Sequence, residues 1–494
     1  MSADLLRTKN MNELKQTDAK QSNNKKLATN MFLFTLVNFV PKVFSFILVP
    51  VYTAYLSTEE YGISDLVINT ASLLLPIFSL SINNAVLRFT IENKDDIRPY
   101  NIGMLHSFGS SALLALGLFL TTQFTDINVG YLFFIFVIYA SNAISDIFLG
   151  YLRAQEEMYL ITFCGVGSSI ICLVSNILLI VVLRLGAYGF IISTAVGYLF
   201  NVVVILYHLR NKKVFDIHSI KCQKQLARDM YSYSIPLAVS GITWWIYSSS
   251  DRYFVSGMCG IEENGIYSVA NKVPNMLQML QNVFSQAWMF SIFSIYKTRE
   301  GKEYIAKVYY MVSYVMCLGA SVLITGNILL ARVLYSKEFY AAWRYVPPLL
   351  LSITFTAIGT VMGQVLIAHK ETKFQAKVAL FTALLNCLLN FMLIKVTKDA
   401  LGAAIATAII ALIGSSMTTW KGVKIGEIKI NSIKYIVMIM ILVAECCAMI
   451  GYKNSAICGL LTAVIAIINI DHNRWLINKF MTLLRKRLVR QKIR

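Results

Sequence analysis

The chain has 494 residues, of which 57% are hydrophobic and only 14% are charged, and its mean hydropathy is +0.61. Soluble proteins carry roughly a quarter charged residues, so the composition excludes a soluble globular protein. The formal net charge is +19. The anionic inner leaflet of a membrane can balance this charge, so the charge does not indicate that the protein binds nucleic acid.

The first thirty residues are polar and rich in lysine, and they lack an apolar core followed by a small-residue cleavage site. We therefore expect a cytoplasmic tail and no cleaved signal peptide. The apolar residues that follow are gathered into runs of roughly 20 residues, the length of a helix that crosses hydrocarbon. The sequence predicts fourteen spans, near residues 31–53, 64–90, 102–124, 130–152, 160–183, 187–209, 231–255, 264–293, 304–332, 345–368, 375–396, 401–420, 433–452 and 455–471.

An internal repeat organises these spans. LSTEEYGISDL at 56–66 aligns with CGIEENGIYSV at 259–269, which pairs Gly62 with Gly265. Further matches at 151–158 with 365–372 and at 188–199 with 401–412 keep the same order, with one slip that we place near Ser336 to Arg344. Six helices repeated in the same orientation predict two bundles related by a pseudo-twofold axis along the membrane normal.

The predicted fold class is therefore all-α, with two six-helix bundles and an accessory helix pair. Its parts are a cytoplasmic N-tail (1–30), an N-terminal bundle (31–209), a basic cytoplasmic connector (210–230), a C-terminal bundle (231–420), accessory helices thirteen and fourteen (421–472) and a basic C-tail (473–494). Most of the 45 Lys and Arg residues fall in the tails and the even-numbered connections, which places both termini in the cytoplasm.

Ionisable side chains inside the spans are candidate functional residues, because a charge in hydrocarbon is costly. Four cations stand out: Lys42, Arg88, Arg252 and Lys272. Lys272 could instead extend to the interface, and Arg88 could anchor at the headgroups. Three acids could couple transport to an ion: Asp146, Asp251 and Glu445. Glu445 could instead meet a polar partner within the accessory pair.

A stripe of amides follows one face of the eighth span. It comprises Asn271, Asn275, Gln278, Asn282 and Gln286, at spacings of three or four residues. The repeat places polar residues at matching positions of the second span, among them Asn69 and Asn83, and Trp244 adds an aromatic surface. Amides donate and accept hydrogen bonds, so these residues are candidates for contact with a glycan in a hydrated cleft. The alternative is that the amides join neighbouring helices.

Nine cysteines and five histidines are scattered without metal-ligand spacing. We expect no metal site, no disulfide framework and no cofactor. No loop is long enough to house a soluble catalytic domain.

Three segments carry a resemblance to a known family: LVPVYTAYLSTEEYGISDL at 48–66, SDRYFVSG at 250–257 and EENGIYSVANKVPNML at 262–277. The chain resembles the polysaccharide flippases, or O-antigen repeat-unit translocases, of the multidrug/oligosaccharidyl-lipid/polysaccharide exporter superfamily. The resemblance implies a MATE-like fold in the bacterial inner membrane. It also implies movement of undecaprenyl-pyrophosphate-linked oligosaccharides to the outer leaflet by alternating access.

Under this resemblance, Lys42, Arg88, Arg252 and Lys272 match the basic residues of a cationic cleft that would hold the pyrophosphate. The implied partners are the lipid-linked glycan, membrane lipid and the polysaccharide polymerase and chain-length machinery. Two alternatives stay open. One is a cation-coupled multidrug exporter on the same fold, which would use the acidic residues, and the other is a membrane enzyme that processes glycans.

Overall fold

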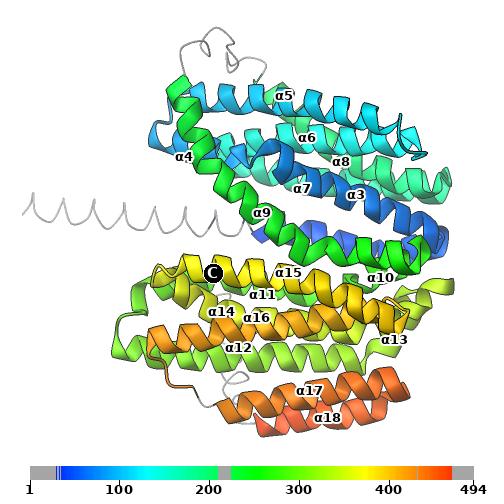
Figure 1. The fold of residues 1–494 in the computed structure, drawn as a ribbon, viewed down its shortest axis with the longest axis vertical. Coiled ribbons are helices and arrows are strands. Elements are labelled where there is room, and N and C mark those ends of the chain that lie inside the picture. Colours follow the sequence, from blue (N-terminus) through cyan, green and yellow to red (C-terminus); the bar gives the residue numbers. More distant parts are fainter. Residues whose placement is uncertain (1–28, 30–32, 34, 210–223, 431, 470–494) are drawn as a thin grey trace, which may run out of the picture. The chain divides into compact units, whose positions relative to one another are not determined.

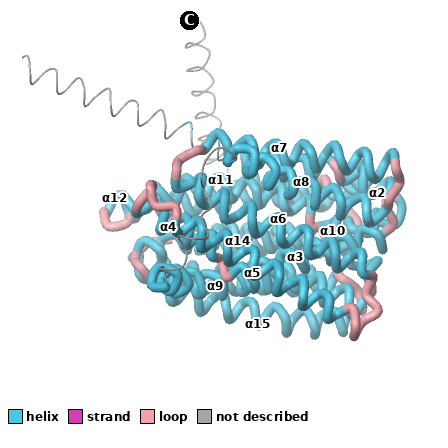
Figure 2. Tube along the Cα trace, turned by 90° about the horizontal axis from the view of Figure 1, so that it is seen from above, coloured by secondary structure: helices cyan, strands magenta, loops and turns pink. Residues whose placement is uncertain are grey.

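The computed structural model describes residues 29, 33, 35–209, 224–430 and 432–469. This part of the chain consists of helices joined by short loops and contains no strand (Figure 2). The all-α prediction is confirmed. The predicted N-tail and C-tail and most of the basic connector lie outside the described residues.

Eleven helices in the described chain are long and apolar enough to cross a membrane. The other three predicted spans correspond to α9 (Lys224–Cys259), to α10 (Ile261–Ala270) followed by α11 (Lys272–Ile295), and to α18 (Ser455–Ile468). The first two carry many polar side chains and α18 is short, which explains why hydropathy alone does not select them. The protein is a multi-pass membrane protein.

The chain divides into two compact units. Unit 1 comprises Met1–Ser45, Leu74–Leu178 and Ile191–Ala238, and unit 2 comprises Phe46–Leu73, Leu179–Phe190 and Val239–Arg494. We describe each unit by itself.

Unit 1 is built around α4 (Ile82–Glu92), α5 (Arg98–Thr121), α6 (Val129–Ala154) and α7 (Met158–Asn176), with most of α8 (Gly186–Leu209) and the beginning of α9. Its core includes the fully buried Val86, Ile147 and Phe148. A Cβ on Gly150 would lie 2.9 Å from the Asn83 carbonyl oxygen, so the glycine allows α4 and α6 to pack closely.

The second predicted span, 64–90, is wrong as a single helix. The helix α3 (Thr58–Ser79) ends before Leu80 and Ser81, whose φ angles are 49° and 51°, and α4 then begins at Ile82. Residues other than glycine rarely adopt this left-handed conformation, and two in succession interrupt the helical hydrogen bonds.

Unit 2 is built around α14 (Val346–Ala368), which packs against α11, α12 (Arg299–Thr325) and α16 (Leu401–Gly426). Small residues bring these helices close: a Cβ on Gly359 would lie 2.9 Å from the Ser415 Cα. The unit also contains the α-helices α2 (Val49–Tyr55), α13 (Asn327–Leu334) and α15 (Thr372–Thr397) and the 3-10 helix η3 (Lys337–Arg344). The π-helix η1 (Ile177–Val182) belongs to unit 2 from Leu179 onward.

The accessory pair consists of α17 (Ser432–Tyr452) and α18, which pack against each other and against α12 (Figure 1). Residues without a counterpart in the repeat therefore form an added helical hairpin on one side of unit 2.

The N-terminal parts of α3 and α10 cross in unit 2 at equivalent positions of the repeat. A Cβ on Gly62 would lie 2.2 Å from the Ile261 carbonyl oxygen, and a Cβ on Gly265 would lie 2.0 Å from the Thr58 carbonyl oxygen. Thr58 aligns with Ile261 and Gly62 aligns with Gly265, so the two contacts are reciprocal. Reciprocal contacts are the signature of a twofold relationship, and the predicted pseudo-twofold plan is confirmed at this crossing.

Candidate functional site

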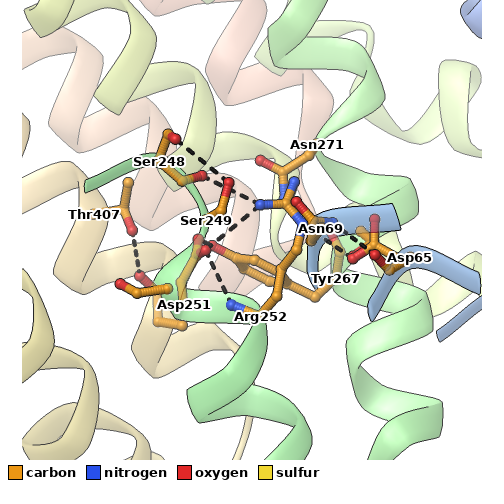
Figure 3. A network of polar contacts seen from close by, with 12 residues as sticks. Asp65, Asn69, Ser248, Ser249, Asp251, Arg252, Tyr267, Asn271 and Thr407 are labelled. Carbon is orange, nitrogen blue, oxygen red and sulfur yellow. Dashed lines mark hydrogen bonds and ion pairs between the residues drawn. The ribbon is translucent and has the colours of Figure 1, made fainter. Parts of the chain in front are cut away.

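Arg252 lies at the centre of a polar network next to this crossing (Figure 3). Its Nε lies 3.1 Å from Asp65 Oδ2, its Nη1 lies 3.7 Å from Asp251 Oδ1, and Nη1 also donates to the Ser248 carbonyl at 3.2 Å. The side chains of Arg252, Asp65 and Asp251 are 14%, 16% and 8% exposed. The guanidinium predicted to hold a phosphate is thus paired with two carboxylates.

Residues of α10 complete the network from the other side. The Tyr267 hydroxyl donates to Asp251, and the Ser268 hydroxyl donates to Asp65 Oδ2 at 2.8 Å. Each carboxylate therefore has a cation and a hydroxyl donor, the pairing that buried charges require. The network joins α3, α9 and α10 at the end of unit 2 that holds the α2–α3 and α9–α10 turns.

Asp65 is a member of this site that the sequence prediction missed. Asp65 lies next to the predicted beginning of the second span. A charge at a helix end costs little free energy there, because it lies close to the membrane surface. The available signal was the repeat, which aligns Asp65 with the polar Ser268.

The predicted glycan contacts Asn69 and Asn271 border the network but use their amide groups locally. Asn69 Nδ2 donates to the Asp65 carbonyl at 2.8 Å, and Asn271 Nδ2 donates to the Tyr267 carbonyl at 3.0 Å, each within its own helix. The Trp245 indole donates to the Asn69 carbonyl at 3.2 Å. The amide nitrogens of Asn69 and Asn271 are therefore used within the helices. Their side-chain oxygens are the atoms that could accept a hydrogen bond from a ligand.

A cavity of about 280 Å³ lies in unit 2 between α9, α14, α15 and α16. Its surface is mostly apolar and carries hydroxyl groups, two glutamines, three glycines and two aromatic rings. The polar and aromatic lining residues are Thr243, Trp244, Tyr247, Thr356, Thr360, Gln364, Gln375, Thr382, Ser415 and Thr418. All lining residues are described, and none of them is acidic or basic.

Within this neutral cavity, the Trp244 ring is 58% exposed and lies 5.8 Å from the Tyr247 ring. Gln375 Nε2 donates to the Gly363 carbonyl at 2.7 Å, whereas the buried Gln364 Oε1 accepts no hydrogen bond from a described residue. The wall therefore offers an aromatic face and hydroxyl groups to a polar, uncharged ligand.

Of the predicted glycan contacts, Trp244 lines this cavity. The remaining amides of the α11 stripe lie elsewhere on unit 2: Asn275, Gln278 and Gln286 are half-buried and Asn282 is exposed. The buried Gln281, outside the predicted stripe, donates to the cavity residue Thr360 at 3.1 Å. Asn83 lies in α4 of unit 1 and is half-buried. The glycan role of these residues stays a prediction.

The other predicted cations are distributed over both units. Lys42 has an exposed side chain on the helix Thr35–Tyr55, in the part of this helix up to Ser45 that belongs to unit 1. Arg88, also in unit 1, pairs with Glu92 at 3.6 Å and lies 4.8 Å from the centre of the Tyr233 ring. Lys272 opens α11 in unit 2. Lys42 and Arg88 belong to unit 1, and Arg252 and Lys272 belong to unit 2. A cationic cleft shared by all four stays a prediction.

The remaining acidic candidates are buried to different degrees. Asp146 is half-buried in α6. Glu445 in α17 is 0% exposed, and its Oε1 accepts hydrogen bonds from Ser321 at 2.6 Å and Thr462 at 3.1 Å. Ser321 belongs to α12 and Thr462 to α18, so Glu445 meets polar partners that hold the accessory pair together. Among the described residues, no group of three His, Cys, Asp or Glu side chains is arranged to hold a metal ion.

The sequence model of the family described as "Polysaccharide biosynthesis protein" matches residues 27–297, which is more than half of the chain. The chain belongs to this family. The match confirms the family resemblance carried by the segments at 48–66, 250–257 and 262–277. Among curated protein sequences, none matches this polysaccharide biosynthesis protein.

Solved structures of several transporters share the fold. The lipid II flippase MurJ in an inward closed conformation is 13% identical, with a TM-score of 0.64 over 89% of this chain and 99% of that chain. An inward-facing multidrug resistance MATE family transporter is 13% identical, with a TM-score of 0.58 over 80% and 98%. The Vibrio cholerae MATE transporter VcmN is 13% identical, with a TM-score of 0.53 over 82% and 97%. At this identity they establish a MATE-like fold for this polysaccharide biosynthesis protein.

Proposed function

We propose that the protein is a transporter that moves undecaprenyl-pyrophosphate-linked oligosaccharides from the cytoplasmic to the outer leaflet of the bacterial inner membrane. The observation that carries the proposal is the neutral cavity of unit 2. Its hydroxyls, amides and Trp244 ring suit sugar rings, which present hydroxyl groups at their edges and apolar C–H faces. The family match supports the same substrate class.

The cavity also discriminates against a cationic drug. A cation taken from water into a cavity of low dielectric needs a carboxylate partner, since an unpaired charge there costs several kcal/mol or more. None of the residues that line this cavity supplies one. Asp251 of α9 and Asp65 of α3 are already paired with Arg252.

The pyrophosphate group needs cations, and we propose Lys42, Arg88, Arg252 and Lys272 for this role. Arg252 and Arg88 are engaged by Asp65 and Glu92 in the described structure. A pyrophosphate bound to either arginine would have to displace its carboxylate. At Arg252 this exchange would tie substrate binding to a change in the contact between α9 and α3, whereas Arg88 and Glu92 both lie on α4.

That link suggests how access alternates. The α3–α10 crossing and the Arg252 network lie at the end of unit 2 that the distribution of Lys and Arg assigns to the outer side. We propose that these contacts close the outer end and that they separate when the substrate is released. The cavity-lining Tyr247 precedes Arg252 on α9 by five residues, about 7.5 Å along the helix axis, so the two sites can act on one bound molecule.

A cation-coupled multidrug exporter is the second candidate, and Glu445 is the observation that favours it. Its Oε2 is buried and accepts no hydrogen bond from a described residue, as expected of a carboxyl group that binds a proton or a cation. The fold is shared with multidrug transporters, so the fold itself does not separate the two candidates.

Surface polysaccharide and dye efflux, measured in the same strains, separate the candidates. A host that lacks the gene would receive the wild type, a variant with Thr360→Val and Thr418→Val in the cavity, or Glu445→Gln, each at a protein level matched by immunoblot. The proposal predicts loss of surface polysaccharide in the deletion and in the cavity variant, with ethidium efflux unchanged throughout. Reduced ethidium efflux with normal polysaccharide would instead support the exporter.

A further inference from the structure

A long groove on unit 1 is separate from the neutral cavity. It is about 710 Å³ in volume and is formed by the α3–α4 break, α5 and the beginning of α9. Along α5 the lining residues are Ile102, Leu105, His106, Gly109, Ser110 and Leu113. These positions recur at intervals of three or four residues and therefore lie on one face of the helix. Ile102 and Leu113 are separated by a rise of about 16 Å along the axis.

The polar atoms in the wall of this groove are already used within the protein. His106 Nε2 lies 3.0 Å from the Phe78 carbonyl, which the break in the helix leaves without its usual partner, and His106 Nδ1 lies 3.0 Å from the Tyr231 hydroxyl. Because a carbonyl can only accept, Nε2 carries the proton and Nδ1 accepts from Tyr231. Ser110 accepts from the Tyr139 hydroxyl at 3.0 Å and donates to the Ser107 carbonyl at 3.1 Å. The groove therefore presents a mostly apolar surface.

One end of the groove carries a positive charge. Lys224, the first residue of α9, lines it, has an exposed side chain and forms no ion pair within the described part of the chain. The helices α5 and α9 begin at the same end of unit 1, where Lys224 lies (Figure 1). From this end the apolar wall continues to Leu113, so the groove is cationic at one end and apolar along its length.

These dimensions match one leaflet of a membrane. The hydrocarbon core of a bilayer is about 30 Å thick, so one leaflet accounts for about 15 Å, close to the run from Ile102 to Leu113. We propose that the groove binds an anionic glycerophospholipid, with its phosphate group at Lys224 and one acyl chain along α5. The bound lipid contacts the end of α3 and Leu80 in the break, and it stabilises unit 1. This inference does not depend on what the neutral cavity binds.

Two glycines of α5 provide a matched pair of variants. A Cβ added at Gly109, in the groove, or at Gly117, outside it, meets no atom within 4 Å. Gly109→Leu should therefore fill the groove without a backbone clash, and Gly117→Leu controls for the added side chain. Lys224→Gln removes the charge at the groove, whereas Arg228→Gln removes an exposed charge one turn further along the same helix.

The test uses the purified full-length protein in nanodiscs of neutral phosphatidylcholine with phosphatidylglycerol that carries a photoreactive diazirine in one acyl chain. Cross-linked peptides are located by mass spectrometry. We expect labelling of residues 98–121. Unlabelled phosphatidylglycerol should compete about fivefold better than phosphatidylcholine, the factor equivalent to about 1 kcal/mol for one lysine at an anionic surface. Lys224→Gln should remove this preference, Gly109→Leu should remove most of the labelling, and both controls should behave as wild type.

Three results would overturn the proposal. The first is cross-linking that is spread evenly over the apolar helices. The second is equal competition by phosphatidylglycerol and phosphatidylcholine. The third is a Gly109→Leu variant with unchanged labelling and the melting temperature of the wild type. Stronger competition by undecaprenyl phosphate than by phosphatidylglycerol would also reject a phospholipid and assign the groove to the prenyl carrier.

Discussion

Asp65 and Ser268 occupy the same position in the two halves of the chain and are hydrogen-bonded to each other, with the Ser268 hydroxyl donating to Asp65 Oδ2 at 2.8 Å across 203 residues of sequence. Gly62 and Gly265 are related in the same way and lie at the crossing of α3 and α10. A residue on a twofold axis contacts its own counterpart, so the axis of the repeat passes between these pairs. The proposed outer closure is thus built at the symmetry axis.

A disulfide across this axis should lock the protein. The test introduces Asp65→Cys and Ser268→Cys into a protein from which the native cysteines have been removed. The two sulfur atoms then lie where the side chains of Asp65 and Ser268 are in contact. Oxidation of membrane vesicles should stop translocation of lipid-linked glycan, and dithiothreitol should restore it. Each single-cysteine variant controls for the loss of the Asp65–Ser268 contact. Full translocation with the disulfide formed would show that this end does not open.

The stability of unit 2 should depend on the balance of charge around Arg252. Arg252→Gln leaves the buried Asp65 and Asp251 without a cation and should cost about 3 kcal/mol, seen as a lower melting temperature in detergent. The double variant Arg252→Gln/Asp65→Asn should recover a large part of that loss. If the single variant melts like the wild type, Arg252 serves the substrate alone and the network is not structural.

Gln364 and Gln375 should respond in opposite ways to the same substitution. Gln364→Leu removes a buried oxygen that has no donor among the described residues, so the melting temperature should stay constant or rise, while glycan translocation should fall about tenfold. Gln375→Leu removes the hydrogen bond to the Gly363 carbonyl and should destabilise the protein by about 1 kcal/mol. Normal translocation by a stable Gln364→Leu protein would argue against glycan binding in the cavity.

The glycine crossing should not tolerate a methyl group. In Gly265→Ala, the new Cβ meets the Thr58 carbonyl oxygen at 2.0 Å, so the two backbones must separate, at a cost of about 1–3 kcal/mol. Gly117→Ala meets no atom within 4 Å and should be neutral or slightly stabilising, because alanine favours the helix. Thermal unfolding of both variants in detergent checks the prediction, and equal melting temperatures would contradict the close crossing.

Glu445 should be replaceable by glutamine. The amide oxygen of a glutamine at this position would still accept from Ser321 and Thr462, so Glu445→Gln should retain stability and translocation. Glu445→Ala should lose about 1–3 kcal/mol of stability, because it removes the buried carboxylate to which both hydroxyls donate. Unfolding and transport are measured on the same preparations. A stable Glu445→Gln protein without transport would assign Glu445 an ion-coupling role.

The helical plan of the protein was predictable because hydrocarbon demands long apolar helices, and the repeat predicted the crossing at Gly62 and Gly265. The break after α3 was not predictable from composition. Neither Leu80 nor Ser81 is a glycine or a proline, and next to the break the Phe78 carbonyl makes a tertiary hydrogen bond with His106. Apolar periodicity does not encode such a contact.

The candidate site was predictable only where charge was conspicuous. Arg252 stood out inside a span, but its partner Asp65 lay at the edge of one and drew no attention. The threonines of the neutral cavity gave no signal either, because hydroxyl side chains are common in membrane helices and usually bond to their own backbone, as Thr360 does to the Thr356 carbonyl. Their convergence on one cavity is a property of the packing of α14, α15 and α16.

The leaflet that holds the lipid-linked glycan tests the central claim most directly. In a host deleted for the gene, the undecaprenyl-pyrophosphate glycan should accumulate on the cytoplasmic side. Wild-type protein should return it to the outer side, and Gln364→Leu at the same protein level should do so about tenfold more slowly. Unchanged distribution of the glycan between the leaflets in the deletion strain, with no second transporter of this family present, would contradict the account.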